Sequence, residues 1–114
     1  MYIRLIAISA DEKEAAQILD SVLKEIQKSI INKEIRLLEP YWKIEGRYEI
    51  EANINLDFDS NFSNNRIQTF LNSISDKWIM YGSPVNEVLA SQTTEGCNIL
   101  KNGVSLINIF FENM

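Results

Sequence analysis

The sequence predicts an α+β domain, because two helical patterns alternate with several strand-like segments. The clearest strand pattern covers residues 48–58, where every even position is apolar: Tyr48, Ile50, Ala52, Ile54, Leu56 and Phe58. A period of two predicts a strand with one face on a core. Apolar residues within 15–30, and again within 67–74, recur at the three-four spacing of a helix with one buried stripe.

The first strand and helix are expected at the amino-terminal end. Tyr2 to Ser9 is apolar at both parities, which predicts a short central strand that is covered on both faces. Ser9 and Glu12 have the spacing of a capping box, so a helix is expected to begin there. Its apolar stripe continues to Ile30, and lysines toward its end suit the negative end of the helix dipole.

A hairpin is expected between residues 36 and 58. A three-residue loop centred on Gly46 would pair Ile44 with Tyr48, since loops of this length commonly contain glycine. The outer strand, residues 36–44, would then lie at the edge of the sheet. A longer first helix followed by one long strand is the competing assignment.

A second helix of about four turns is expected after the hairpin, with Asp59, Ser60 and Ser63 as candidate caps. The remaining patterns predict a strand at 78–81, a strand at 85–93, a loop at 94–103 and a closing strand at 104–111. Together these elements predict two helices on one face of a mainly antiparallel sheet. The specific expectation is a ferredoxin-like split βαβ core with extra C-terminal strands, in a single domain of residues 1–114.

Composition limits the classes of partner. The chain has a net charge of −5 and a pI near 4.7, so its field opposes binding to nucleic acid and to anionic membranes. The first apolar run, at 5–8, is too short for a signal peptide, and no run approaches a membrane span. Cys97 is the one cysteine and has no partner for an internal disulfide. A cytoplasmic protein is therefore expected.

Catalysis is not expected, and neither is a cofactor. The chain has no histidine, so the usual base near neutral pH is missing and Cys97 has no imidazole to activate it. Carboxylates on alternate positions of an exposed strand, such as Glu49 and Glu51, stay solvated and ionised without a pocket. The sequence therefore predicts a protein that is not an enzyme.

A metal site is not expected either. Asp57, Asp59 and Asn61 have the 1, 3, 5 spacing of a calcium-binding EF-hand loop. Phe62 stands where that loop needs glycine, and Gln68 stands where it needs glutamate. A strand end followed by a helix cap explains the same residues.

The acidic face of the hairpin is the candidate site. Residues 39–59 contain six acidic and two basic side chains, which is −4 of the total net charge of −5. Complementary charge would accelerate encounter with a basic protein. The candidate partner-binding residues are Tyr41, Glu49, Glu51, Asn53, Asn55, Asp57 and Asp59.

In size, charge and layout, and in the acidic hairpin face with Glu49, Glu51, Asp57 and Asp59, the chain resembles the small immunity proteins that accompany polymorphic or contact-dependent bacterial toxins. The resemblance implies neutralisation in the cytoplasm of a cognate toxin, often a basic nuclease, by covering its active site or substrate path. A monomer or weak homodimer is expected.

Two alternatives remain open. One is a self-associating structural or regulatory domain that pairs through its open sheet face or its edge strand. The other is a small-molecule-binding ferredoxin-like domain, in which Trp42, Trp78 and Tyr81 line a pocket.

Overall fold

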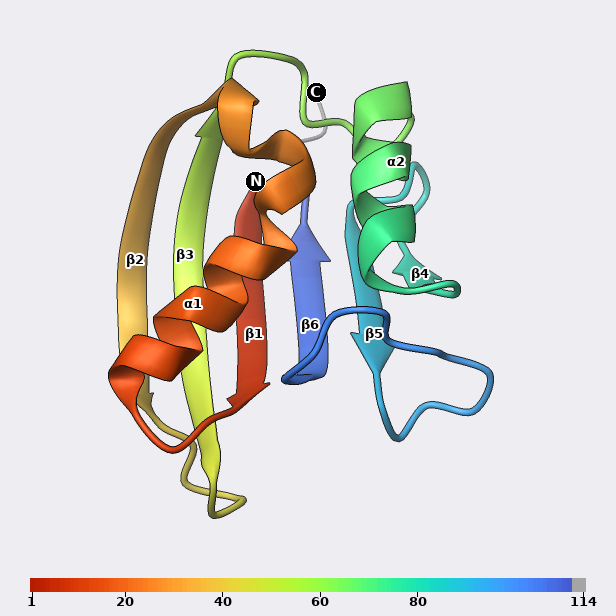
Figure 1. The fold of residues 1–114 in the computed structure, drawn as a ribbon. Coiled ribbons are helices and arrows are strands. Elements are labelled where there is room, and N and C mark those ends of the chain that lie inside the picture. The colour runs from red at the N-terminus through yellow and green to blue at the C-terminus, as the bar shows by residue number, and fades with distance from the viewer. Residues whose placement is uncertain (112–114) are drawn as a thin grey trace.

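The computed structural model describes residues 1–111, so residues 112–114 of the expected 1–114 domain lie outside that range. The elements are β1 (Tyr2–Ile8), α1 (Glu12–Val22), the 3₁₀ helix η1 (Lys24–Ser29), β2 (Ile30–Pro40), β3 (Arg47–Leu56), α2 (Asn65–Ile74), β4 (Ile79–Tyr81), β5 (Glu87–Ser91) and β6 (Val104–Phe110). The described strands form one antiparallel sheet of six in the order β2-β3-β1-β6-β5-β4 (Figure 1). The predicted α+β class and antiparallel sheet are confirmed.

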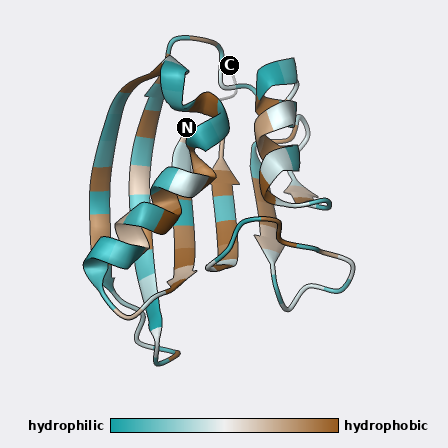
Figure 2. Cartoon of the chain, in the orientation of Figure 1, coloured by the Kyte–Doolittle hydropathy of each residue, from teal (hydrophilic) through white to brown (hydrophobic). Residues whose placement is uncertain are grey.

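The core combines helix side chains with one set of strand side chains. Figure 1 shows α1 and α2 in front of the sheet, and Figure 2 shows β6 as a mainly hydrophobic strand interrupted by a hydrophilic band. The helices contribute Ala15, Leu19, Val22, Ile67, Phe70 and Leu71 to the buried cluster. The strands contribute Ile3, Leu5, Ala7, Ile50, Ala52, Ile54, Val88, Ala90, Ile107 and Ile109. The even positions of β3 are therefore the buried ones, as the period of two indicates.

The first helix is shorter than expected and is capped later. It ends at Val22, and η1 follows before β2 begins at Ile30, so a continuous helix to residue 30 or beyond is wrong. Burial of Ile26 within η1 extends the apolar stripe past α1 without continuing the α-helix. The N-cap is Asp11, whose carboxylate accepts a hydrogen bond from the Glu14 amide at 2.8 Å.

Ser9 shapes the turn ahead of this cap and is not the cap itself. Its hydroxyl donates to the Asp11 carbonyl oxygen at 2.6 Å, and it also accepts from the Asp11 amide. The expected box between Ser9 and Glu12 is therefore wrong. A carboxylate two residues later satisfies the free amide at the start of the helix.

The hairpin forms, but its expected register is wrong. Leu38 lies opposite Ile50 and Pro40 opposite Tyr48, so the loop after β2 is longer than three residues. In both of these pairs the two residue numbers sum to 88, whereas pairing Ile44 with Tyr48 gives a sum of 92. Both sums keep even residues opposite even ones, so the period of two cannot choose between them.

The edge strand β2 carries features that discourage further pairing. Its register to β3 shifts between Ile30 and Asn32 and again between Ile35 and Leu37. Such bulges, together with lysine and proline on an edge, interrupt the regular row of backbone donors and acceptors. Lys33 and Pro40 lie on the same strand, so β2 is poorly suited to pair with a second chain.

The second helix also differs from expectation at its start. Asn64 caps it, because its side-chain oxygen accepts from the Arg66 amide at 2.8 Å, and Asp59, Ser60 and Ser63 are not the cap. The helix has ten residues, which is shorter than the four turns expected. The extra strands β4 and β5 come before β6 in the sequence. Within residues 1–111, no helix combines the length and hydropathy that crossing a membrane requires.

Candidate protein-binding surface

The face of the sheet that points away from the core cluster is here called the open face. The register places Glu49 and Glu51 of β3 on this face, opposite Ile6 and Arg4 of β1. It continues across β6, where Leu106 lies opposite Ile6. In the described part of the chain, none of these five side chains belongs to the core cluster. Ile6 is buried, whereas the other four are partly exposed, so a partner can reach the sheet through those four.

Arg4 occupies the centre of the charged half of this face. Its Nε donates a hydrogen bond to Glu49 Oε2 at 2.7 Å, and the two side chains are 32% and 13% exposed. Partial burial lowers the pKa of Arg4. The charge of Glu49 and the hydrogen bonds of Arg4 to Glu49 and to Tyr41 together have a larger effect in the opposite direction, so the pKa of Arg4 lies above its ordinary value. Arg4 thus brings two of the predicted site residues, Tyr41 and Glu49, together.

Glu51 lies beside Tyr2 on the same face. Burial raises the pKa of the Tyr2 hydroxyl, and the charge of Glu51 and its hydrogen bond to Tyr2 raise it further, while Arg36 acts in the opposite direction. The tyrosine therefore stays a neutral donor to Glu51. Much of the acidic charge predicted for this face is balanced or hydrogen-bonded within the protein.

The other predicted residues extend toward the far end of β3. Asn53 lies opposite Tyr2 on the open face, and Asn55 is exposed at the end of the strand. Asp57 and Asp59 follow in the loop, where Asp57 Oδ1 lies 3.9 Å from Arg66 Nη1. The structure thus groups Tyr41, Glu49, Glu51 and Asn53, continues their row to Asn55 at the end of β3, and places Asp57 and Asp59 in the loop beyond it. A binding role for all seven stays a prediction.

Sequence reasoning missed the second half of the open face. On β6, Asn108 is only 9% exposed, and its Nδ2 donates to Glu87 Oε2 at 3.1 Å and to the Val88 carbonyl at 2.9 Å. Leu89 of β5 lies opposite Asn108. A single asparagine inside the apolar run 104–111 was the available signal, because a buried amide needs hydrogen-bond partners.

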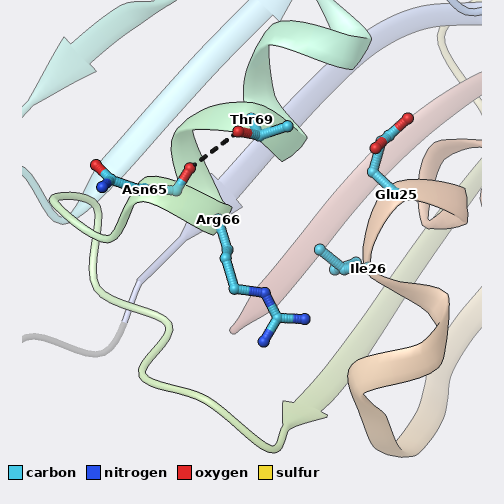
Figure 3. A pocket seen from close by; sticks show the side chains of 5 residues that line it. All are labelled: Glu25, Ile26, Asn65, Arg66 and Thr69. Atoms are coloured by element: carbon cyan, nitrogen blue, oxygen red, sulfur yellow. Dashed lines mark hydrogen bonds between the residues drawn. The ribbon is translucent and has the colours of Figure 1, made fainter.

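A hollow between η1 and α2 does not favour a ligand. It measures about 210 Å³, below the usual range for small-molecule sites. Figure 3 shows Glu25 directed away from Arg66, and Thr69 Oγ1 donates to the Asn65 carbonyl at 3.1 Å. The Arg66 guanidinium is engaged elsewhere, since it donates to Ser29 Oγ and lies 4.0 Å from the centre of the Phe58 ring.

The structure also locates the residues of the metal site and of the aromatic pocket that were considered from the sequence. Among residues 1–111, no group of three or more histidine, cysteine, aspartate or glutamate side chains is arranged to hold a metal ion. The three aromatic residues of the alternative pocket lie in different settings. Trp42 is 81% exposed in the hairpin loop, Trp78 packs on the core with its Nε1 3.0 Å from the Leu71 carbonyl, and Tyr81 ends β4.

Known proteins provide no further guide to this surface. Comparison of the chain with protein-family models, with curated proteins and with solved structures finds no match.

Proposed function

We propose that the protein is an immunity protein that binds and neutralises a cognate protein toxin through the open face. The observation that carries the proposal is the opposition of two carboxylates, Glu39 on β2 and Glu49 on β3. Like charges directly opposite one another destabilise a sheet. Arg4 contacts Glu49, whereas Glu39 remains exposed at the edge. A basic partner would supply the counter-charge that this edge lacks.

The composition of the open face also supports a protein partner. Charged side chains on β2 and β3 adjoin half-exposed apolar side chains on β1 and β6, among them Ile8 and Leu106. Protein interfaces commonly combine an apolar centre with polar surroundings. The acidic contribution centres on Glu39 and Glu51, because Glu49 is committed to Arg4.

The proposal includes two finer points about the protein itself. The strand order β2-β3-β1-β6, with α1 and α2 in the crossover connections, supports a ferredoxin-like split βαβ core, which β4 and β5 would extend beyond β6. The protein acts in the cytoplasm, where it meets toxin that enters or is made there. Self-association through β2 is less favoured, because that edge carries two bulges and a lysine.

The test begins with capture of partners from the native host on tagged protein, washed at low and at moderate salt. The captured toxin domain is then purified, and its association rate is measured with the wild type, with Glu39→Lys and with the control Glu14→Lys on α1. We expect association with Glu39→Lys to be roughly tenfold slower at low salt and the control to be unchanged.

Co-expression measures neutralisation directly. Cells that make the captured toxin domain should recover growth when they also make the wild-type protein, and should recover less with Glu39→Lys. Toxin-producing cells that stay arrested beside abundant wild-type protein would show that the proposed function is wrong.

A further inference from the structure

Four side chains form a row across one end of the open face, here called the aromatic row: Tyr81 of β4, Glu87 of β5, Phe110 of β6 and Tyr2 of β1. Each lies opposite the next in the strand register. Directly opposed residues of antiparallel strands have Cβ atoms about 4.5–5.5 Å apart. Glu87 is therefore flanked on both sides by an aromatic residue.

The Glu87 carboxylate is held in position from within the sheet. Asn108 Nδ2 donates to Glu87 Oε2 at 3.1 Å, and the same nitrogen donates to the Val88 carbonyl at 2.9 Å. Because Asn108 is 9% exposed, its amide is fixed by burial and by these two bonds. An ionised carboxylate accepts about four hydrogen bonds, so Glu87 retains acceptor capacity for a ligand.

The two flanking rings are accessible. Tyr81 is 44% exposed and Phe110 37% exposed. Phe110 also contacts Tyr2, with ring centres 6.2 Å apart and planes tilted by 55°, which limits the movement of its ring. Aromatic faces attract cations, and a carboxylate between two of them adds a full counter-charge.

Glu87 has no cation of its own within the described chain. The ion pairs found within residues 1–111 join Arg4 to Glu49, Lys33 to Asp20, Arg36 to Glu34 and Arg66 to Asp57, and none of them includes Glu87. The aromatic row thus combines a fixed, half-exposed carboxylate with accessible rings.

We propose that the aromatic row binds the cationic side chain of an arginine or lysine of the partner protein. This inference rests on the proposed function for the identity of that partner, and it adds a second contact point to Glu39. Glu39 and Glu87 lie four strand spacings apart across the sheet, roughly 19 Å, and four residues apart along the strands, roughly 13 Å, which together give a separation of about 23 Å. The partner surface therefore presents two basic groups at about this separation, on a surface that also faces the half-exposed Leu106.

The test uses small probes and the full chain, so it needs no toxin. Backbone amide shifts are followed by NMR during titration with N-acetyl-arginine methylamide, with N-acetyl-lysine methylamide and with the neutral isostere N-acetyl-citrulline methylamide. We expect one or both cationic probes to shift the amides around the aromatic row. Citrulline should bind at least fivefold more weakly.

Variants locate the site. Glu87→Gln keeps the shape and removes the charge, and should weaken cation binding about fivefold; Phe110→Leu keeps an apolar side chain and should weaken it about threefold. Glu14→Gln removes the same charge from α1 and should change nothing. Well-dispersed amide spectra establish that each variant is folded.

The inference is overturned if citrulline shifts the same amides equally, if neither cation shifts them, or if Glu87→Gln binds like the wild type. If Glu39→Lys still slows toxin binding when such a result is obtained, only cation binding by the aromatic row is wrong, and the proposed function stands. If instead the aromatic row binds cations but the protein does not protect toxin-producing cells, only the proposed function is wrong.

Discussion

The Nε atom of Arg4 lies 2.7 Å from Oε2 of Glu49 and joins the central strand β1 to β3 across 45 positions of sequence. Glu49 also faces Glu39 of β2, so the arginine balances one of two opposed carboxylates. Because the pair is only partly exposed, removal of its arginine costs more than breaking a surface ion pair and less than leaving one charge of a fully buried pair without its partner.

Replacing Arg4 by Gln should therefore lower the free energy of unfolding by about 1–2 kcal/mol. Urea denaturation at neutral pH measures the loss. Lys33→Gln, which breaks the exposed pair with Asp20, is the control and should cost at most about 0.5 kcal/mol. Adding Glu39→Gln to Arg4→Gln should recover part of the loss. Equal losses in Arg4→Gln and in the control Lys33→Gln would contradict this role for Arg4.

The raised pKa of Tyr2 predicts a loss of stability in alkaline solution. Unfolded tyrosine loses its proton near pH 10.0, whereas burial and Glu51 keep Tyr2 protonated to higher pH in the folded protein. The unfolded state then binds fewer protons, so the free energy of unfolding falls as pH rises above about 10. The difference in stability between the wild type and Tyr2→Phe should be constant below pH 9 and should shrink above pH 10. A pH-independent difference would contradict the shift.

The position of the first helix cap is tested by two neighbouring substitutions. Asp11→Ala removes the carboxylate that accepts from the Glu14 amide and should cost about 1 kcal/mol. Glu12→Ala should cost less, because Glu12 is not the partner of a Ser9 capping box. Chemical denaturation of both variants decides the matter, and a larger loss for Glu12→Ala would favour the box.

Two glycines with positive φ should respond differently to alanine. Gly46 has φ 77°, and apart from its own atoms and its two chain neighbours nothing lies within 4 Å of an added Cβ, so Gly46→Ala should cost about 1 kcal/mol from backbone strain alone. Gly103 has φ 84°, and an added Cβ would lie 2.6 Å from Ile18 Cδ1, so strain and crowding combine to cost about 2 kcal/mol or more. Thermal unfolding should rank the two in this order, and the reverse order would show that the turn at Gly103 relaxes freely.

Sequence reasoning was most reliable where burial is periodic. Ile50, Ala52 and Ile54 are all at most 1% exposed, as the alternation in β3 indicates. The three C-terminal strands also lie where residue preferences placed them. Helix ends were less accurate, because η1 continues the apolar stripe of α1 in a different geometry.

The candidate site was predicted only in part. Glu49, Glu51 and Asn53 share the open face, since parity within β3 is a local property, whereas Tyr41 joins them from the loop after β2. The arginine that balances Glu49, and the asparagine that holds Glu87, come from strands distant in sequence. No spacing pattern within one segment contains such pairings.

By itself, the sequence determined the α+β class, the inner and outer residues of β3 and the acidic composition of the hairpin. Hydrophobic periodicity carries this information, because each residue's burial follows from its place in a local repeat. The tertiary structure alone decided that Pro40, and not Ile44, lies opposite Tyr48, and that Arg4 balances Glu49. Strand register and cross-strand contacts depend on loop length and on packing between distant segments, and parity cannot distinguish registers that differ by an even number of residues.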